Sequence, residues 1–339
     1  MSEKPPETGR LLAICIPTYN RVDKLRRCIE SVLPLTGNGD VEICVSDNAS
    51  TDSTGELLET YAKCNDSFRY DRRASNGGID VNMLAVGRMA RSKYIFWLGD
   101  DDIAIKSEME KLVEYLKSAD CDCLIAPLEP RGGGGGIFGS AEEFFAEYGM
   151  IGCDSNMHFS TILLRSEALH PQSVARYIGT YHLYAGAVVD YLCDRQAAGS
   201  CKAVIWDRPL CNVAKSDKTW SKEVEDVFYK KILQWWRLLP NEIRRSKCCK
   251  EAYSKYLWLV TNTLWARKKF RWRYVKESPY FSVLGLLKRS VSAFVGRGFR
   301  RGGVKYKLFR IGPFRFARRS KRARLKGIFK IKQGKVKGK

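Results

Sequence analysis

The sequence is short of the residues that build zinc sites and disulfide frameworks. It has three histidines, His158, His170 and His182, and its 12 cysteines show no paired CxxC spacing. Zinc sites draw Cys and His ligands from closely spaced pairs, so no zinc framework is indicated. The cysteines are scattered through expected strands, helices and the basic end of the chain. This distribution favours reduced thiols that serve as small buried residues in a cytosolic protein.

Long apolar runs and a secretory leader are also missing. No stretch approaches the roughly 18 uninterrupted apolar residues that indicate a membrane-spanning helix. The first ten residues, MSEKPPETGR, lack the basic and then apolar pattern of a signal peptide. We therefore expect a cytoplasmic protein that is soluble or peripheral on a membrane.

Acidic residues are almost absent from the last part of the chain. Residues 241–339 hold 31 of the 59 Lys and Arg but three of the 37 Asp and Glu, and no acid follows Glu277. The last 99 residues therefore carry about +28 and the first 240 about −6, which together give the net charge of +22. Such a division of charge predicts two different physical roles for the two parts.

Residues 94–103, YIFWLGDDDI, are the stretch around which the first part is organised. The aromatic and aliphatic run 94–98 has the length and composition of a buried strand. It ends at Gly99 and is followed by Asp100, Asp101 and Asp102. Three adjacent carboxylates repel one another, and their hard oxygen ligands suit Mg²⁺ or Mn²⁺ bridged to a diphosphate. A solvated acidic turn is the alternative reading of the same residues.

Strand and helix patterns alternate on both sides of this stretch. Residues 11–16, 41–45, 68–71 and 94–98 read as strands, and 23–33, a segment from Ser53 or Thr54 to 62, 79–91 and 106–117 read as helices. This alternation predicts an α/β fold with a parallel, doubly wound sheet. Each strand is followed by polar, turn-forming residues, and ligands of such sheets bind beyond the carboxyl ends of the strands. We expect these four strand ends to line one crevice.

The pattern continues less clearly after residue 120. Strands are expected at 121–127, at 157–164 with His158, and at 203–206, and a helix at 141–148. The glycines of 132–136 indicate a flexible loop, either a lid or an ordinary surface loop. From residue 224 the apolar spacing is helical.

Four motifs in this order resemble family 2 glycosyltransferases with the GT-A fold. The motifs are ICIPTYNR at 14–21, VSDNASTD at 45–52, NGG at 76–78 and WLGDDD at 97–102. The last is most similar to abequosyltransferase-like O-antigen sugar transferases. The resemblance covers roughly residues 11–105, weakens beyond 165 and is absent from the basic end. It implies a Rossmann-like, mostly parallel sheet flanked by helices that binds a sugar nucleotide and a divalent metal.

The resemblance also assigns residues to the donor site. It implies that the nucleotide-sugar is bound by Pro17, Thr18, Tyr19, Arg21, Asp47, Asn76, Gly77 and Asp100. Asp47 would accept a hydrogen bond from the base, and Asp52 would stabilise its loop. Asp101 or Asp102 would hold the Mn²⁺ or Mg²⁺. Where the family often has Asp-x-Asp-Asp, this chain has Gly99 in place of the first acid.

An inverting sugar transfer also needs a base that takes the proton of the acceptor hydroxyl. Members of the family commonly carry a Glu-Asp pair in the stretch that corresponds to 186–192, and that pair is missing here. Asp190 is the first candidate base, His182 the second and Asp154 the third. The ordinary alternatives are a carboxylate on a helix face for Asp190 and a packed histidine for His182.

The basic end alternates cations with aromatic residues from Arg267 onward. This pattern favours a segment on an anionic membrane surface, while nucleic-acid binding and a solvated tail are the alternatives. We divide the chain into a GT-A domain at 1–215, with a donor half at 11–105 and an acceptor half at 106–215. A helical extension at 216–290 and a basic tail at 291–339, disordered or on a membrane surface, would follow.

The sequence thus predicts a metal-dependent, inverting glycosyltransferase. Its partners would be a nucleotide-sugar donor, a lipid-linked saccharide acceptor of surface polysaccharide assembly and the inner face of the plasma membrane. Two rival functions remain open: a nucleic-acid-binding protein with a non-catalytic sheet domain, and a nucleotidyltransferase, which shares the sheet and the metal.

Overall fold

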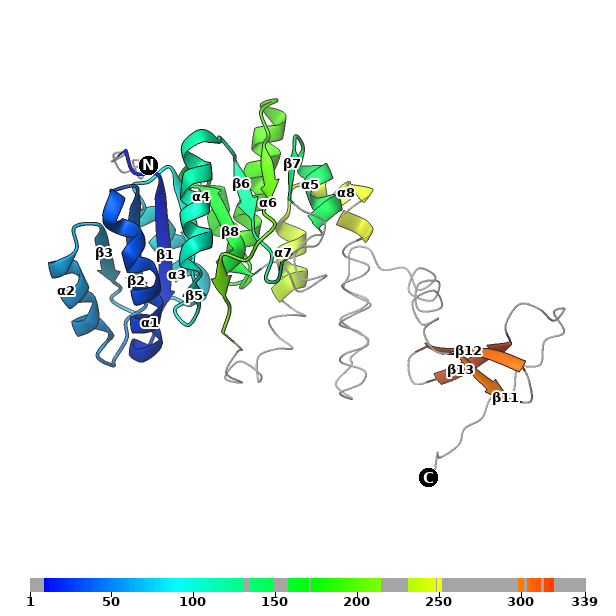
Figure 1. Cartoon of the computed structure of the whole chain (residues 1–339). Coiled ribbons are helices and arrows are strands. Elements are labelled where there is room, and N and C mark those ends of the chain that lie inside the picture. The colour runs from blue at the N-terminus through cyan, green and yellow to red at the C-terminus, as the bar shows by residue number, and fades with distance from the viewer. Residues whose placement is uncertain are drawn as a thin grey trace, which may run out of the picture. The chain divides into compact units, whose positions relative to one another are not determined.

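The computed structural model describes residues 9–130, 135–148, 158–170, 172–214, 231–247 and 249–251, and the backbone of three later strands within 298–319. The chain divides into two compact units, residues 1–253 and 254–339. All elements of the proposed sugar-nucleotide site lie in the first unit, which Figure 1 shows from blue to yellow.

An eight-stranded mixed sheet forms the centre of the first unit (Figure 1), with the strand order β3-β2-β1-β4-β8-β6-β9-β7. The strands are β1 (Leu12–Thr18), β2 (Val41–Asp47), β3 (Phe68–Arg72), β4 (Tyr94–Trp97), β6 (Cys123–Ile125), β7 (Gly136–Phe138), β8 (Ile162–Arg165) and β9 (Ala203–Ile205). The four strands β3, β2, β1 and β4 are parallel, as the sequence predicts. β8 then runs antiparallel to both β4 and β6.

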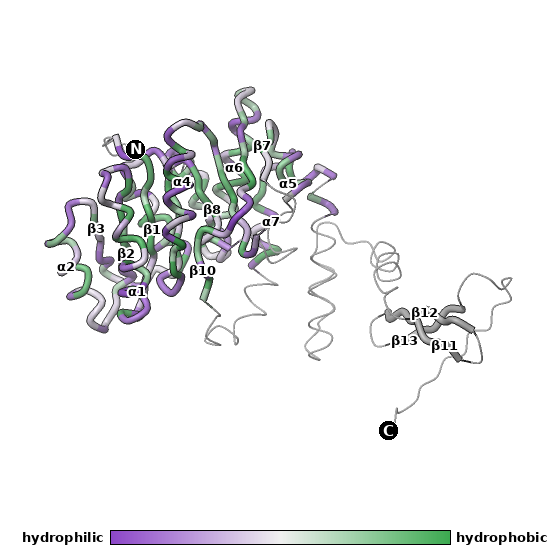
Figure 2. Tube along the Cα trace, in the orientation of Figure 1, coloured by the Kyte–Doolittle hydropathy of each residue, from purple (hydrophilic) through white to green (hydrophobic). Residues whose placement is uncertain are grey.

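Helices cover both faces of this sheet. They are α1 (Val22–Val32), α2 (Thr54–Cys64), α3 (Ile79–Met89), α4 (Lys106–Ser118), α5 (Ala141–Tyr148) and α6 (Leu183–Ala197). One apolar core joins α1, α2 and α4 to one side of β1, β2 and β4, through buried residues such as Leu25, Leu57 and Met109. α3 packs on the other side, where a Cβ on Gly87 would lie 2.3 Å from Leu169 Cδ1. All seven residues of β1 and of β2 are buried, and β1 has the colour of apolar residues along most of its length in Figure 2.

Short elements that the sequence analysis did not predict complete this unit. β5 (Ile103–Ala104) pairs with β10 (Cys211–Asn212), and short 3-10 helices occur at η1 (Leu33–Asn38), η2 (Phe159–Thr161), η3 (Ser166–Leu169) and η4 (Gln172–Tyr177). The strand expected at 157–164 begins only at Ile162, because η2 precedes it and His158 caps that turn. The glycine-rich stretch 132–136 was predicted as a loop, but Gly136 already belongs to β7.

The start of α2 also differs from the prediction. Neither Ser53 nor Thr54 caps it with its own oxygen, because Asp52 Oδ1 accepts the Thr54 N–H at 3.1 Å. Ten cysteines in the described residues are free thiols and eight of these are buried, as expected for small packed residues. The apolar pattern after residue 224 does form helices where it is described, α7 (Ile232–Leu238) and α8 (Asn241–Arg245).

The second unit contains a three-stranded antiparallel sheet of β11 (Gly298–Arg301), β12 (Val304–Ile311) and β13 (Phe314–Arg319). These strands were not among the elements expected from the sequence. Basic and apolar residues alternate over much of β12, a period that suits a strand, and the Gly-Gly and Gly-Pro pairs between the strands are typical turn sequences. No helix in the described part of the chain has the length and hydropathy to span a bilayer.

Candidate active site

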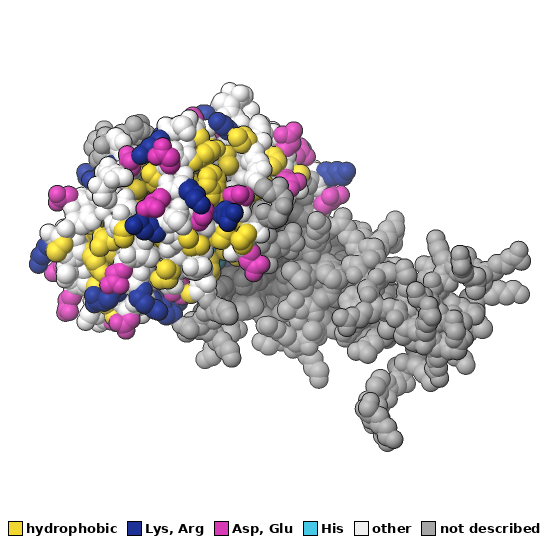
Figure 3. Space-filling view, in the orientation of Figure 1, with side chains coloured by type: hydrophobic (Ala, Val, Ile, Leu, Met, Phe, Trp, Pro, Cys, Tyr) yellow, Lys and Arg dark blue, Asp and Glu magenta, His cyan; other side chains and the backbone are white. Residues whose placement is uncertain are grey.

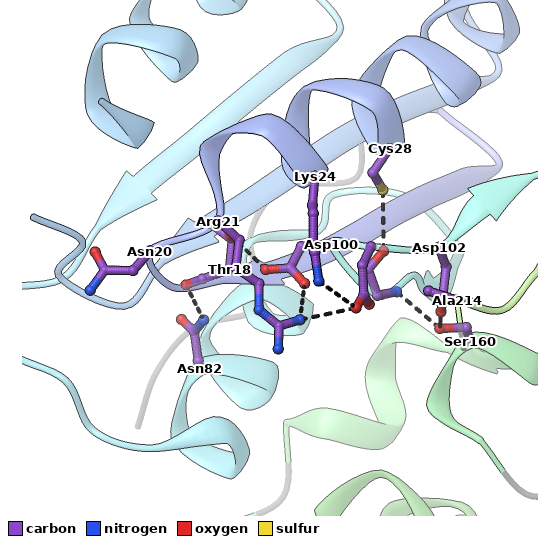
Figure 4. A network of polar contacts seen from close by, with 12 residues as sticks. Thr18, Asn20, Arg21, Lys24, Cys28, Asn82, Asp100, Asp102, Ser160 and Ala214 are labelled. Atoms are coloured by element: carbon purple, nitrogen blue, oxygen red, sulfur yellow. Dashed lines mark hydrogen bonds and ion pairs between the residues drawn. The ribbon is translucent and has the colours of Figure 1, made fainter. Parts of the chain in front are cut away.

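The acidic turn after β4 lies against the end of β1 and the start of α1 (Figure 4). Asp100 is buried and accepts a hydrogen bond from Thr18 Oγ1 at 2.9 Å and one from Arg21 Nη1 at 3.0 Å. Burial raises the pKa of Asp100, while Arg21 and Thr18 act in the opposite direction. This carboxylate is therefore held in place by two residues that the sequence analysis assigned to the donor site.

Asp101 is the most accessible of the three carboxylates in the turn. Its side chain is 22% exposed, and Oδ2 lies 3.2 Å from Arg21 Nη1 and 3.7 Å from Lys24 Nζ. Two cations thus face one carboxylate at the carboxyl edge of the sheet. Lys24 was missed by the sequence analysis, although it lies one helical turn after Arg21 and so shares its face of α1.

Asp102 is fixed in a different way. It is 1% exposed and accepts hydrogen bonds from the Ser160 hydroxyl and from the Ala214 N–H, the latter at 2.9 Å. Ser160 Oγ in turn accepts the Gly99 N–H at 2.9 Å, so one hydroxyl holds both ends of the turn. His158 Nδ1 lies 3.9 Å from Asp102 Oδ2. These contacts make Asp102 an anchor of the acidic turn.

The geometry therefore separates the two predicted metal ligands. Among the described residues, no group of three or more His, Cys, Asp and Glu side chains is placed to enclose a metal ion. An Mg²⁺ or Mn²⁺ ion commonly takes one or two carboxylates and completes its shell with phosphate oxygens and water. Asp101 fits that role because its carboxylate is accessible, whereas both oxygens of Asp102 already accept hydrogen bonds from the protein.

The loop after β2 carries Asp47, the predicted base-binding residue. Its side chain is fully buried, and Oδ1 accepts the Ser50 N–H at 2.9 Å. Oδ2 lies 3.3 Å from Arg72 Nε in an ion pair whose geometry falls short of a hydrogen bond. Oδ2 is thus the oxygen of Asp47 that a ligand N–H could engage, after Arg72 moves.

Asp52 stabilises the same loop, as expected. Its Oδ2 accepts the Val22 N–H at 3.1 Å, which ties the loop to the first residue of α1. Asn20 contributes from the β1 side, because its N–H is 2.8 Å from Ser50 Oγ and its Oδ1 accepts the Thr51 N–H at 2.7 Å. Asn20 and Ala49 have positive φ angles of 52° and 65°, backbone strain of a kind that gathers at functional sites.

Asn76 and Gly77 join this loop through Asn48. Asn48 Nδ2 donates to Asn76 Oδ1 at 2.8 Å, and Asn48 Oδ1 accepts the Gly77 N–H at 3.0 Å. Gly78 follows with φ 83°, a conformation that favours glycine. The ends of β1, β2 and β4 and the loop after β3 thus converge as predicted.

The remaining predicted donor residues are placed by β1. Pro17 is buried in the strand opposite Ser46 of β2, whereas Tyr19 is 42% exposed just beyond the strand end. Asn82, in α3, was missed by the sequence analysis. Its Nδ2 donates to the carbonyls of Thr18 at 3.3 Å and Ser46 at 3.0 Å, and so holds the two strand ends together.

The structure does not bring Asp190 to the acidic turn through any described contact. Asp190 Oδ1 accepts hydrogen bonds from Arg176 Nη2 at 2.6 Å and Tyr177 Oη at 2.8 Å, and both donors also reach the Leu238 carbonyl. Asp190 therefore links η4, α6 and α7. Burial raises its pKa to about 6, against the opposing effects of Tyr177 and Arg176.

His182 lies at the cap position of α6. It is 5% exposed, and its Nδ1 lies 3.5 Å from Tyr184 Oη. Asp80, which the sequence analysis missed, bonds the backbone on both sides of His182, at Tyr181 and Leu183. Asp154 lies outside the described residues.

Comparisons with known proteins agree with this geometry. Residues 13–174 match the family model of glycosyl transferase family 2. Abequosyltransferase RfbV from Salmonella typhimurium is 39% identical over 110 residues, which are 32% of this chain and 33% of the relative. The chain thus aligns with about a third of the length of this curated relative.

Two solved structures share the fold. TarS 1-349 from S. aureus in complex with UDP-GlcNAc has a TM-score of 0.58 and 12% identity, and the match covers 90% of this chain and 99% of that one. A mannosyltransferase from Pyrobaculum calidifontis in complex with GDP-Man and Mn²⁺ has a TM-score of 0.53 and 14% identity over 85% of this chain and 78% of that one. Residues 13–174 thus match glycosyl transferase family 2, and the chain has the GT-A fold of these structures.

Proposed function

We propose that the protein is a metal-dependent, inverting glycosyltransferase that moves a sugar from a nucleotide-sugar to a hydroxyl of a saccharide acceptor. The observation that carries this proposal is the meeting of Asp100 and Asp101 with Thr18 and Arg21 at the carboxyl edge of the sheet. Ligands of open α/β sheets bind at this edge. The family 2 match and the TarS complex with UDP-GlcNAc support a nucleotide-sugar as that ligand.

The donor would lie across the ends of β1, β2 and β4. Asp47 Oδ2 would accept a hydrogen bond from the base once Arg72 moves, while the Asn48–Asn76–Gly77 contacts keep the neighbouring loop in position. Asp100 would face the ribose in this arrangement, and Thr18 and Arg21 orient its carboxylate.

Asp101 would hold a divalent ion, Mn²⁺ or Mg²⁺, and the Pyrobaculum mannosyltransferase complex with Mn²⁺ supports a metal of this class. When bound, such an ion neutralises the charge that develops on the departing nucleoside diphosphate. Arg21 and Lys24 can serve the same anion, because both reach Asp101 from the start of α1 and would face the diphosphate once the metal takes the carboxylate. Asp102 keeps the turn rigid through Ser160 and Ala214.

The acceptor hydroxyl must lose a proton during transfer. Of the two described candidates, His182 is joined to the donor side by the bonds that Asp80 makes on either side of it. Asp190 is engaged by Arg176 and Tyr177 through Oδ1. We therefore favour His182 as the base and reserve a structural role for Asp190.

We further propose a lipid-linked acceptor in surface polysaccharide assembly, with the enzyme peripheral on the cytoplasmic face of the membrane. The similarity to an abequosyltransferase supports the polysaccharide role, and the charge of about +28 on residues 241–339 supports an anionic surface. By contrast, basic and acidic side chains are interspersed on the face of the first unit shown in Figure 3. The membrane contact is therefore assigned to the basic end.

Calorimetric titration with UDP, GDP, CDP and dTDP, with and without Mn²⁺, tests the donor site. We expect one diphosphate to bind in a Mn²⁺-dependent way, and Asp101→Asn to weaken this binding about tenfold or more. Asp120→Asn is the matched control, since Asp120 is a paired but 65% exposed carboxylate just before β6 and should have no effect. If the folded wild-type protein binds none of the four, the proposed function is wrong.

A further inference from the structure

A single buried carboxylate on α3 organises the backbone on the acceptor side of the site. Asp80 is 3% exposed, and its Oδ2 accepts the N–H groups of Gly179 and Tyr181, both at 2.8 Å. Its Oδ1 accepts the N–H of Leu183 at 3.3 Å. Hydrogen bonds to an ionised acceptor are roughly twice as strong as neutral ones. Asp80 is therefore a major attachment of residues 177–183 to the donor half.

The segment that Asp80 holds has a strained and closely bonded backbone. Tyr181 has φ 64°, which is costly for a residue with a bulky side chain and persists only where surrounding contacts impose it. Thr180 Oγ1 donates to the Tyr177 carbonyl at 2.6 Å and accepts the His182 N–H at 3.2 Å. The conformation of 177–183 sets where α6 begins and where His182 lies.

The other side of the same helical turn is attached to the donor loops. Asn82 bonds the carbonyls of Thr18 and Ser46 at the ends of β1 and β2. Gly78 caps α3, and the Gly78 carbonyl accepts from Asn48 Nδ2 at 3.4 Å. The first turn of α3 therefore contacts the strand ends that receive the nucleotide and, through Asp80, the segment that carries His182.

We propose that Asp80 is a positioning residue that couples the donor loop 76–78 to the acceptor-side segment 177–183 and thereby places His182. This inference rests on the proposed function, because the coupling matters only if the donor loop binds a nucleotide-sugar. In the reaction, binding of the donor orders 76–78, and the bonds of Asp80 transmit that order to the backbone around His182.

Hydrogen–deuterium exchange on the full chain tests this coupling. The variants are Asp80→Asn, which keeps the shape but removes the charge, and Asp122→Asn as a control. Asp122 is also buried and accepts a backbone N–H, that of Lys202, at 2.7 Å. It precedes β6, whose strand runs parallel to β4, and so lies at the opposite edge of the sheet from Asp100.

In the free protein we expect Asp80→Asn to speed exchange of the amides of residues 179–183 about tenfold or more, as loss of charge-assisted bonds implies, and Asp122→Asn to leave them unchanged. The diphosphate identified by calorimetry, added with Mn²⁺, should slow exchange of 177–183 in wild type and in Asp122→Asn. In Asp80→Asn the same diphosphate should still bind, within about threefold of wild type, but should no longer slow that exchange.

Two results would overturn the inference while leaving the proposed function intact. One is wild-type protein that binds the diphosphate with no change in exchange at 177–183, an outcome that decides the matter even if Asp80→Asn does not fold. The other is equal slowing in wild type and in Asp80→Asn. If the wild-type protein binds no diphosphate, both the coupling and the proposed function are wrong, and the calorimetric titration shows this.

Discussion

Substitution of Ser160 by alanine should loosen the acidic turn and reduce catalysis. The Ser160 hydroxyl donates to Asp102 and accepts the Gly99 N–H at 2.9 Å, and the residue is 1% exposed. No water from bulk solvent can readily replace it at that depth. The substitution therefore removes two hydrogen bonds at once and leaves a buried N–H without its acceptor.

The magnitude follows from these two losses. A hydrogen bond to a charged group contributes about 1.5 to 3 kcal/mol, and a buried donor left without a partner costs about 1 to 3 kcal/mol. We expect Ser160→Ala to lower the free energy of unfolding by about 3 kcal/mol, because partial relaxation of the turn recovers some of the loss. The affinity for Mn²⁺ and diphosphate should fall as well, since the same turn carries Asp101.

Urea unfolding and calorimetry together measure both effects. Ser118→Ala is the matched control, because Ser118 is exposed near the end of α4 and donates only to the Tyr115 carbonyl, at 3.3 Å. The control should change stability by less than about 0.5 kcal/mol. If Ser160→Ala is as stable as that control and binds Mn²⁺ and diphosphate normally, the anchoring role of Asp102 is refuted.

Two further predictions concern buried carboxylates away from the turn. Arg69→Met should lower the free energy of unfolding by about 3 kcal/mol, because it leaves Glu42, which is 0% exposed, without its ion-pair partner at 2.9 Å. Urea unfolding measures this, and unchanged diphosphate binding would confirm that the effect is confined to stability. Burial raises the pKa of Asp190 to about 6, so this carboxylate binds its proton more tightly in the folded protein than in the unfolded chain. The free energy of unfolding of the wild type should thus fall by up to about 3 kcal/mol, relative to that of Asp190→Asn, as pH rises from about 4 to 7. A difference between the two proteins that does not change with pH would contradict this.

The parallel half of the sheet could be predicted because its signals are local. β1 is apolar over residues 12–16, β2 has four apolar residues within 41–45, and Leu25, Cys28, Ile29 and Val32 of α1 are buried as their spacing indicates. The short strands could not be predicted in this way. β5 and β10 have two residues each and exist only because Ile103 meets Asn212 across 109 positions of sequence.

The site was predicted as a group of residues, and the roles of its three acids came from the family resemblance rather than from the residues themselves. In the sequence Asp100, Asp101 and Asp102 are equivalent neighbours, and only their partners distinguish them. The partners of Asp102 come from Ser160 and Ala214, distant positions with no motif of their own. Asp80 was missed for a related reason, since an acid in the first helical turn is already explained by the helix dipole.

The basic end shows a third limit of sequence patterns. Alternation of cations with aromatic residues was interpreted as a membrane-surface or solvated tail, and no strand was expected, whereas Gly298–Arg301, Val304–Ile311 and Phe314–Arg319 form strands. The two-residue alternation typical of a strand occurs here in a highly charged segment. The charge favoured a tail, whereas the alternation favoured strands. Membrane binding by this part of the chain stays a prediction.

The most direct test of the central claim is to identify which bond of the donor is broken. Purified protein with Mn²⁺ would be incubated with UDP-, GDP-, CDP- and dTDP-sugars and membrane lipid extract, and the products followed by phosphorus NMR. We predict that the wild-type protein releases the intact nucleoside diphosphate from one donor class and that Asp101→Asn does not. Release of the sugar 1-phosphate, with transfer of the nucleotide to the acceptor, would contradict it and identify a nucleotidyltransferase instead.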